Sequence, residues 1–304
     1  MPTASPTILH KIEYASLRLA VWVLGLVPPR RHEAAARAIA WVLSLFPWRR
    51  GVLEENLATA LGPLDPARRR ELTMGIIRHS VGLALELAWM RRLDPAAIAG
   101  TVDIDPAARE RIERCRAAGK GVILACGHLG NWEWLAAWYA QTAGPVGVVY
   151  KPMHNARTDE FITGLRARFG LEAFSTREPS QRRLVTYLKR GGAVGILSDQ
   201  DARRRGRFVE FFGRPASTAT GMATLAIRLG TPIVPSFCLR DGTGRLRAIV
   251  GEPLWPDPGA DPEAEELRLL RGYHEALERA ILQDPAQYFW WHRRWKTKPK
   301  KIVR

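Results

Sequence analysis

The sequence predicts an α/β fold with a layered, largely parallel central sheet flanked by helices, behind an N-terminal helical extension. From about Ala99 onward, short apolar runs rich in β-branched residues alternate with segments of helical periodicity, a pattern typical of parallel strands joined by helices. Before that point the apolar spacing is helical. We therefore divide the chain into a membrane-anchoring helical extension, residues 1–98, and an α/β domain, residues 99–304.

Proline, glycine and N-capping residues punctuate the predicted elements. In the extension we expect helices over His32–Phe46, Val52–Leu61 and Asp65–Leu93. In the domain we expect strands over Gly121–Cys126, Val146–Tyr150, Ala193–Ser198, Pro232–Leu239 and Leu246–Val250. The helices expected around them are Pro106–Ala118, Ala156–Phe169, Pro179–Arg190, Ser217–Leu229 and Glu263–Gln283.

The first strand of the domain ends in a turn, GHLG at 127–130, that carries a histidine. Asn131 is a good N-cap for the helix that follows. Glu133 lies five residues after His128, so the two side chains can meet only if His128 lies in the turn and Glu133 in the first helical turn. Glu133 would then hold one imidazole nitrogen and leave the other free as a general base.

The two glycines of this turn, Gly127 and Gly130, would let a substrate approach the backbone closely. Amides at the start of the following helix could hold a developing oxyanion. The stretch therefore contains the parts of a general-base acyl-transfer site. One histidine and one glutamate are too few ligands for a metal, and no Cys or His cluster stands nearby.

The spacing alone is unspecific, because 7 histidines and 30 acidic residues in 304 positions produce about 0.7 such pairs by chance. A second pair, His154 and Asp159, also lies in a turn before a helix, but it lacks flanking glycines and ranks lower.

Composition points to anionic partners. The net charge is +16 and the chain has 11 tryptophans, a combination favoured at membrane interfaces. No nucleic-acid-binding motif is present, so we expect no nucleic acid partner. The 3 cysteines indicate neither a disulfide framework nor a zinc cluster. Leu17–Val27 is apolar but too short for a confident span; we favour an interfacial helix, with a buried core helix as the alternative.

Two polar clusters follow the strand that ends near Ser198. Asp199, Gln200 and Asp201 stand where ligands bind in α/β sheets, and the acids could orient His128, bind a hydroxyl, balance cations or simply cap a loop. The arginine run at 203–207 comes next. Its arginines could clamp phosphates, face anionic headgroups or form a solvated loop.

Two aromatic stretches allow more than one interpretation. The segment FVEFFG at 208–213 suits an apolar wall for an acyl chain, although core packing is the simpler account. The segment 287–304, QYFWWHRRWKTKPKKIVR, interleaves aromatics with cations. It suits adsorption to an anionic membrane at least as well as nucleic acid binding. Within it, His292 is either a further polar site residue or a packing histidine.

Five motifs together resemble the bacterial lipid A biosynthesis acyltransferases, within the lysophospholipid acyltransferase group and its histidine-x4-acid motif. They are GHLGNWEW around His128, VYKP at Val149–Pro152, SDQD at Ser198–Asp201, FFGRPA at Phe211–Ala216 and PAQYFWWHRRWKTKP at Pro285–Pro299. They occur in the family's order along most of the chain. The resemblance implies a glycerolphosphate-acyltransferase-like fold.

The resemblance also implies roles for individual residues. His128 would act as the base on an acceptor hydroxyl, and Glu133 would assist it. Arg166 matches a family arginine near the site, and Asp199 and Asp201 match the family's acidic pair. The residues we predict to bind substrate are Gly127, Gly130, Asn131, Lys151, Arg166, Asp199, Gln200, Asp201, Arg203 and Arg204. Lys151 stands where family members commonly have arginine, which weakens a bidentate phosphate contact there.

The function implied is O-acyl transfer from a carrier thioester to a hydroxyl of a membrane glycolipid, most simply a lipid A precursor, at the cytoplasmic face of the inner membrane. Acyl carrier protein, which is acidic, or coenzyme A would supply the acyl group, with no further cofactor. The alternatives are transfer to a phosphatidylinositol mannoside or a lysophospholipid, and hydrolysis, although no GxSxG nucleophile motif is present. A non-catalytic, basic membrane- or nucleic-acid-binding protein ranks below these.

Overall fold

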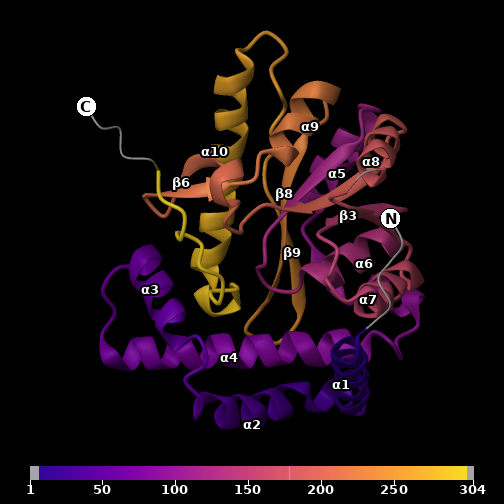
Figure 1. Cartoon of the computed structure of the whole chain (residues 1–304). Helices are drawn as coiled ribbons and strands as arrows, with labels where there is room; N and C mark the ends of the chain where they lie inside the picture. The colour runs from indigo at the N-terminus through magenta and orange to yellow at the C-terminus, as the bar shows by residue number, and fades with distance from the viewer. Residues whose placement is uncertain (1–6, 178, 300–304) are drawn as a thin grey trace.

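A seven-stranded sheet with helices on both faces forms the body of the protein (Figure 1). The computed structural model describes residues 7–177 and 179–299. The strand order is β1-β9-β8-β2-β5-β3-β4. The strands are β1 Val102–Ile104, β2 Val122–Cys126, β3 Val146–Tyr150, β4 Leu171–Ser175, β5 Ala193–Leu197, β8 Ile233–Arg240 and β9 Leu246–Val250.

The sheet is largely parallel, as predicted. Strands β8, β2, β5, β3 and β4 run in one direction, and β9 turns back antiparallel to β8, with β1 parallel to β9. All five residues of β2 are buried, because both faces of the sheet are covered. The carboxyl ends of β2 and β5 therefore lie side by side at one edge.

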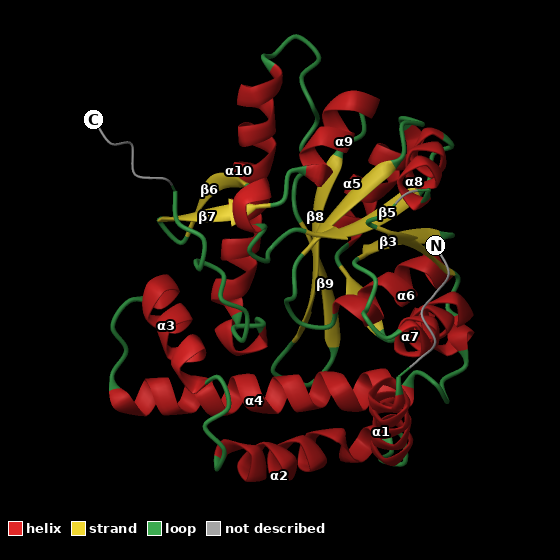
Figure 2. Ribbon diagram, viewed as in Figure 1, coloured by secondary structure: helices red, strands yellow, loops and turns green. Residues whose placement is uncertain are grey.

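Helices cover the two faces separately (Figure 2). On one face, α5 Pro106–Ala117, α6 Trp132–Thr142 and α7 Ala156–Arg168 enclose one apolar cluster. On the other, α8 Ser180–Lys189, α9 Gly221–Leu229 and α10 Pro262–Gln283 enclose a second. This second cluster also contains Leu53, Leu72 and Ile76 from the N-terminal helices, so the extension shares a core with the sheet.

The extension is helical throughout its described part. Its helices are α1 Ile8–Leu24, α2 His32–Ser44, α3 Arg50–Leu61 and α4 Pro66–Trp89. Asp65 is the N-cap of α4, and its carboxylate accepts hydrogen bonds from the amides of Ala67 and Arg68. In Figure 1, α4 lies between α2 and the rest of the molecule. Glu86 of α4 binds Arg240 and accepts a hydrogen bond of 2.7 Å from Asn131 Nδ2, so α4 is tied to the edge of the sheet.

Helix α1 has no buried residue, so the alternative of a buried core helix at Leu17–Val27 is wrong. Among the described helices, none combines the length and apolar character needed to cross a bilayer.

Some elements differ from those predicted. The helix expected over Ser217–Leu229 begins only at Gly221, because Ser217 and Thr218 are fully buried in a hairpin of β6 Arg207–Phe211 and β7 Arg214–Thr218. The short strands β1 and β4 were not expected. The FVEFFG segment forms part of β6 and the hairpin turn, where Phe211 is fully buried, so core packing is the interpretation that holds.

The turn at Gly130 allows a direct test of why a glycine stands there. Gly130 has φ +60°, and a Cβ atom there would lie 1.7 Å from the carbonyl oxygen of Cys238. We expect Gly130→Ala to prevent folding or to lower the free energy of unfolding by several kcal/mol, measured by urea denaturation. The matched control is Gly213→Ala, at φ +66° with open space around it, which should cost only the roughly 1–2 kcal/mol of left-handed backbone. Equal losses of unfolding free energy in the two variants would contradict the close approach of Gly130 to the Cys238 carbonyl.

Candidate active site

His128 is held in the turn between β2 and α6 by the backbone around it. The Gly130 amide donates to the carbonyl of Gln287 at 2.9 Å, and the Asn131 amide donates to the carbonyl of Cys238 at 2.9 Å. The Asn131 side chain caps α6 by accepting from the Trp134 amide at 2.9 Å. A Cβ atom at Gly127 would lie 2.8 Å from Leu277 Cδ1, so the turn packs directly on α10.

Asp199 is the residue that orients the histidine. It follows β5, the neighbour of β2, and its side chain is about 1% exposed. One carboxylate oxygen accepts from His128 Nδ1 at 2.8 Å and the other accepts from the His128 amide at 2.8 Å. The carboxylate therefore fixes both the backbone and the ring, and it leaves Nε2 as the nitrogen available to a substrate.

The two partners shift each other's pKa. Burial alone would lower the pKa of His128, but the charge and hydrogen bond of Asp199, with a smaller effect of Glu133, raise it above its usual value. Burial alone would raise the pKa of Asp199. The charge of His128, its two hydrogen bonds and the charge of Arg294 instead lower that pKa to about 2. The carboxylate is thus ionised near neutral pH.

The predicted contact between Glu133 and His128 is wrong. Glu133 lies in the first turn of α6, as expected, but its carboxylate faces Arg166 of α7. Arg166 donates from Nε at 3.0 Å and from Nη2 at 2.5 Å, a bidentate pair that is mostly buried. The Glu133 side chain on the first turn of α6 thus faces α7 and makes no hydrogen bond with the imidazole.

Aromatic rings surround the imidazole. Trp132 meets it edge to face with ring centroids 4.9 Å apart, and Phe289 lies 5.9 Å away. The His128 side chain remains 24% exposed, and Gln200 Nε2 lies 3.4 Å from its Nε2. Nε2 therefore lies beside a side-chain amide, on a partly exposed imidazole that two aromatic rings contact.

The oxyanion expectation concerned the amides at the start of α6. Two of them already donate within the protein: the Asn131 amide to the Cys238 carbonyl and the Trp134 amide to the Asn131 side chain. For these two amides the expectation is wrong.

An apolar groove opens close to Asp199. It measures about 640 Å³ and lies between α8, α9 and the carboxyl ends of β3 and β5. Ile196, Leu197, Leu184 and Met222 are among its lining residues, as is Ser198, the neighbour of Asp199. Its volume is in the range of ligand sites, and its lining is largely apolar.

The fold and this site agree with what comparison with known proteins finds. The profile of one family, described as bacterial lipid A biosynthesis acyltransferase, matches residues 1–297. The chain belongs to this family. Its sequence is 26% identical to the lipid A biosynthesis lauroyltransferase of Escherichia coli over 83% of this chain and 80% of that enzyme. The palmitoleoyltransferase of the same organism is 26% identical over 78% of this chain and 76% of that enzyme.

Phosphatidylinositol mannoside acyltransferases are also similar. The Mycobacterium tuberculosis enzyme is 26% identical over 63% of this chain, and the match spans 62% of its length, under two thirds. The family description and the names of these relatives all refer to acyltransferases.

No hydrogen bond or ion pair in the described part of the chain joins the imidazole to Lys151, Asp201, Arg203 or Arg204. Lys151 is exposed after β3, and Arg203 and Arg204 are exposed on a short 3-10 turn. Asp201 accepts a hydrogen bond from Thr297 and donates its amide to His292 Nε2, both at 2.9 Å. These contacts make His292 a structural partner of the Asp201 loop.

The second histidine–acid pair does not form. His154 contacts Glu13 of α1 at 3.1 Å. Asp159 instead accepts hydrogen bonds from the Tyr150 hydroxyl and the Met153 amide.

The C-terminal aromatic segment differs most from its prediction. Trp290, Trp291 and Trp295 are buried, so this part of the segment belongs to the core and is no adsorption surface. Arg294 is only 2% exposed and donates to the Ser217 carbonyl and the Thr218 hydroxyl. Its charge contributes to the low pKa of Asp199, a role the sequence did not reveal. Residues 300–304 lie outside the described part.

Because the pKa of Asp199 is lowered from 3.8 to about 2, its ionised form stabilises the fold above pH 3.8, and this contribution is lost as the pH falls toward 2. The raised pKa of His128 has the opposite effect on how stability depends on pH. Its protonated form stabilises the fold below its ordinary value of 6.5, and this is lost as the pH rises through the folded-state pKa. We expect Asp199→Asn to lower the pKa of His128, measured by NMR titration of the imidazole.

The same variant should lose stability less steeply than wild type between pH 4 and 2 in urea denaturation. The matched control is Glu133→Gln, which should lower the pKa of His128 by less, since Glu133 contributes least to it. A larger shift in Glu133→Gln than in Asp199→Asn would contradict the assignment of Asp199 as the partner.

Proposed function

We propose that the protein is an O-acyltransferase that moves a fatty acyl group from a carrier thioester to a hydroxyl of a membrane glycolipid, with a lipid A precursor as the acceptor. The observation that carries this proposal is the His128–Asp199 pair at the ends of two adjacent parallel strands. This geometry suits general-base catalysis, because a buried carboxylate holds Nδ1 and leaves Nε2 directed outward.

In the proposed reaction, His128 Nε2 takes the proton of the acceptor hydroxyl as its oxygen attacks the thioester carbonyl. The new carbon–oxygen bond forms a tetrahedral intermediate, and the carbon–sulfur bond then breaks. The imidazolium returns the proton to the departing thiolate. Asp199 stabilises the imidazolium between the two steps, because its carboxylate stays ionised beside Nδ1.

In this proposal Glu133 and Arg166 do not contact the substrate. They position α6, and the charge of Glu133 acts on His128 electrostatically. Their bidentate pair joins α6 to α7, and so holds the helix that follows the catalytic turn. The charge of Glu133 also favours the protonated form of His128. Breaking such a mostly buried pair leaves one charge without its partner, which costs more than the pair itself contributes.

The groove beside Asp199 is the site we propose for the acyl chain. Its lining is largely apolar, as a hydrocarbon chain requires, and it begins one residue from the partner of His128. Two cations, Arg182 and Arg228, lie in its lining, and Arg203–Arg205 are exposed on the loop after β5. An acidic carrier protein or the phosphates of coenzyme A would be attracted there.

The mutational test uses the same carboxylate-to-amide change at both acids. We expect His128→Ala to lower kcat at least 10³-fold and Asp199→Asn to lower it about 10²–10⁴-fold. Glu133→Gln should lower it about tenfold, because Glu133 does not touch the imidazole. The assay follows transfer from acyl carrier protein to a lipid A precursor by mass spectrometry of the product.

Circular dichroism must show that all three variants fold. Wild-type activity in His128→Ala would remove the proposed base, and a larger loss in Glu133→Gln than in Asp199→Asn would make Glu133 the partner in solution. Release of free fatty acid with no acylated lipid would favour hydrolysis.

Substitutions at two adjacent positions of α8 test whether the groove binds the acyl chain. Val185 lines the groove and is half-buried, whereas Thr186 is exposed and does not line it. We expect Val185→Trp to shift the preferred acyl donor to a chain several carbons shorter, because the indole fills part of the groove. Thr186→Trp should leave the preference unchanged. The measurement is the rate of transfer from a series of saturated acyl donors. An unchanged chain-length preference in Val185→Trp would contradict the assignment of the groove as the acyl-chain site.

A further inference from the structure

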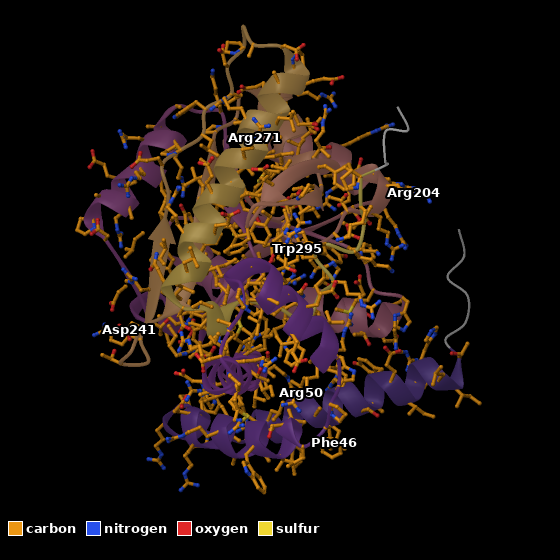
Figure 3. All side chains as sticks on the ribbon, turned by 90° about the vertical axis from the view of Figure 1, so that its left-hand side faces the viewer. Phe46, Arg50, Arg204, Asp241, Arg271 and Trp295 are labelled. Atoms are coloured by element: carbon orange, nitrogen blue, oxygen red, sulfur yellow. The ribbon has the colours of Figure 1, made fainter. Side chains whose placement is uncertain are left out.

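The segment that follows α10 returns through the interior of the protein. In Figure 1 this segment, drawn in yellow, passes between α10 and α3. We call residues 287–297 the strap. Its Trp295 is buried and lies near the centre of the view in Figure 3, whereas Arg204 projects at the edge. The strap is anchored to α3, because the carbonyls of Trp290 and His292 both accept hydrogen bonds of 2.7 Å from the Asn56 side chain.

One end of the strap pairs with the turn that carries His128. The Gly130 amide donates to the Gln287 carbonyl, and the Phe289 amide donates to the His128 carbonyl, both at 2.9 Å. An antiparallel bridge forms between the two segments at this point. The backbone of the strap therefore fixes the turn as a neighbouring strand would.

The other end of the strap holds the loop that begins with Asp199. His292 Nε2 accepts a hydrogen bond from the Asp201 amide, and the Thr297 hydroxyl donates to one carboxylate oxygen of Asp201, both at 2.9 Å. The imidazole of His128 and the carboxylate of Asp199 come from two separate loops. The strap is hydrogen-bonded to both of these loops.

Between the two ends, Arg294 places a cation inside the protein, where its side chain is only 2% exposed. It donates from Nη1 to the Ser217 carbonyl at 2.6 Å and from Nη2 to the Thr218 hydroxyl at 2.7 Å, and its guanidinium lies 5.4 Å from the centroid of the Phe211 ring. Its Nε and one carboxylate oxygen of Asp201 are buried without a hydrogen-bond partner among the described residues. Because the partners of the guanidinium are neutral and it stays charged, its charge has to be balanced by carboxylates farther away.

Several titratable groups surround Arg294 and Asp199. They are Cys126 of β2, His128 of the turn, Glu133 of α6, Asp201 of the loop, Tyr273 and His274 of α10, and Tyr288 and His292 of the strap. Burial lowers the pKa of His274 to about 4 and also lowers that of His292, while it raises the pKa of the thiol and of both phenols. These groups are therefore uncharged near neutral pH. Arg294 is thus the permanent positive charge among them, and it faces the two carboxylates of the loop.

We propose that Arg294 is a positioning residue for the reaction, which acts through the buried carboxylate of Asp199, and that the strap assembles the His128–Asp199 pair around it. A cation in a poorly screened interior favours the ionised carboxylate and opposes a second positive charge on the imidazole. The neutral His128 that acts as a base would then persist to lower pH than beside Asp199 alone. The inference rests on the proposed function only for this last consequence.

The test separates the charge of Arg294 from its shape. Arg294→Met removes the charge, whereas Arg294→Lys keeps it. We expect Arg294→Met to raise the pKa of His128 and Arg294→Lys to leave it closer to the wild-type value, measured by NMR titration. The imidazole signal is assigned by its absence from the spectrum of His128→Ala. In Arg294→Met, kcat/KM at pH 6 should fall about five- to tenfold more than at pH 8, with KM unchanged, because Arg294 does not touch substrate.

The matched control for the charge is Arg168→Met. Arg168 also donates to neutral groups, the carbonyls of Met90, Arg91 and Leu93, but it lies at the end of α7. This variant should lower the urea midpoint and leave the pKa of His128 unchanged.

A second pair of variants tests the strap itself. Thr297→Val removes the hydroxyl that holds the Asp201 loop and should lower kcat about fivefold, because one hydrogen bond near the pair is lost. It should also weaken the downfield Nδ1 proton signal of His128. Thr231→Val removes a comparable bond, from the hydroxyl to the Lys120 carbonyl at 2.6 Å. This control should lower the urea midpoint and keep kcat within about twofold of wild type.

The outcomes that would overturn the proposal are specific. An unchanged pKa of His128 in Arg294→Met, or an equal rise in Arg294→Lys, would remove the role of the charge. If Arg294→Met does not fold, Arg294→Gln, which can still donate to the Ser217 carbonyl, takes its place. Equal losses of kcat in Thr297→Val and Thr231→Val would leave the strap a purely structural segment.

The NMR results do not depend on turnover, so the two proposals fail separately. The expected changes in the pKa of His128, with no acyl transfer by the wild type, would contradict the proposed function alone. Acyl transfer by the wild type, with an unchanged pKa of His128 in Arg294→Met, would contradict only the role of Arg294.

Discussion

The buried carboxylate of Asp199 is the constraint on which the site depends. An ionised carboxylate that is about 1% exposed is stable only if its charge and oxygens are satisfied. Two hydrogen bonds from His128, one from the backbone and one from the ring, meet this need, and the buried Arg294 adds a positive charge nearby. The orientation of the imidazole is thus a consequence of burying the acid beside it.

The same constraint explains the surrounding backbone. Both hydrogen bonds require the turn after β2 to lie directly against the end of β5, which the parallel pairing of Cys126 with Leu197 provides. Gly130 then brings the chain into contact with β8 at a distance that no Cβ atom would permit. Glycine in the turn therefore serves the packing of the backbone, in addition to any approach of substrate.

Much of the sheet was predictable because burial on both faces gives a strand such as Val122–Cys126 an unbroken apolar run. The partner of His128 was predictable only as one of several options. The five-residue spacing across the turn and the first helical turn suggested Glu133, but Arg166, 33 residues later, binds it. Asp199 lies 71 residues from His128, and its claim rested on its place at a strand end, a property of topology. Local sequence does not determine which distant cation or imidazole a carboxylate contacts in the fold.

Tryptophan and arginine occur together in two parts of the chain with opposite outcomes. Near the C-terminus, Trp290 and Trp295 are buried, and the guanidinium of Arg294 finds a carbonyl, a hydroxyl and the face of Phe211. In α1 and α2, the same residue types remain exposed. Composition cannot distinguish these two cases, because an amphipathic side chain such as tryptophan or arginine is suited to a buried position with polar partners and also to a surface position. What separates them is whether the fold buries the rings and supplies polar partners inside: Arg294 has buried partners, whereas Arg18 of α1 and Arg37 of α2 pair with Tyr14 and Glu33 at the surface.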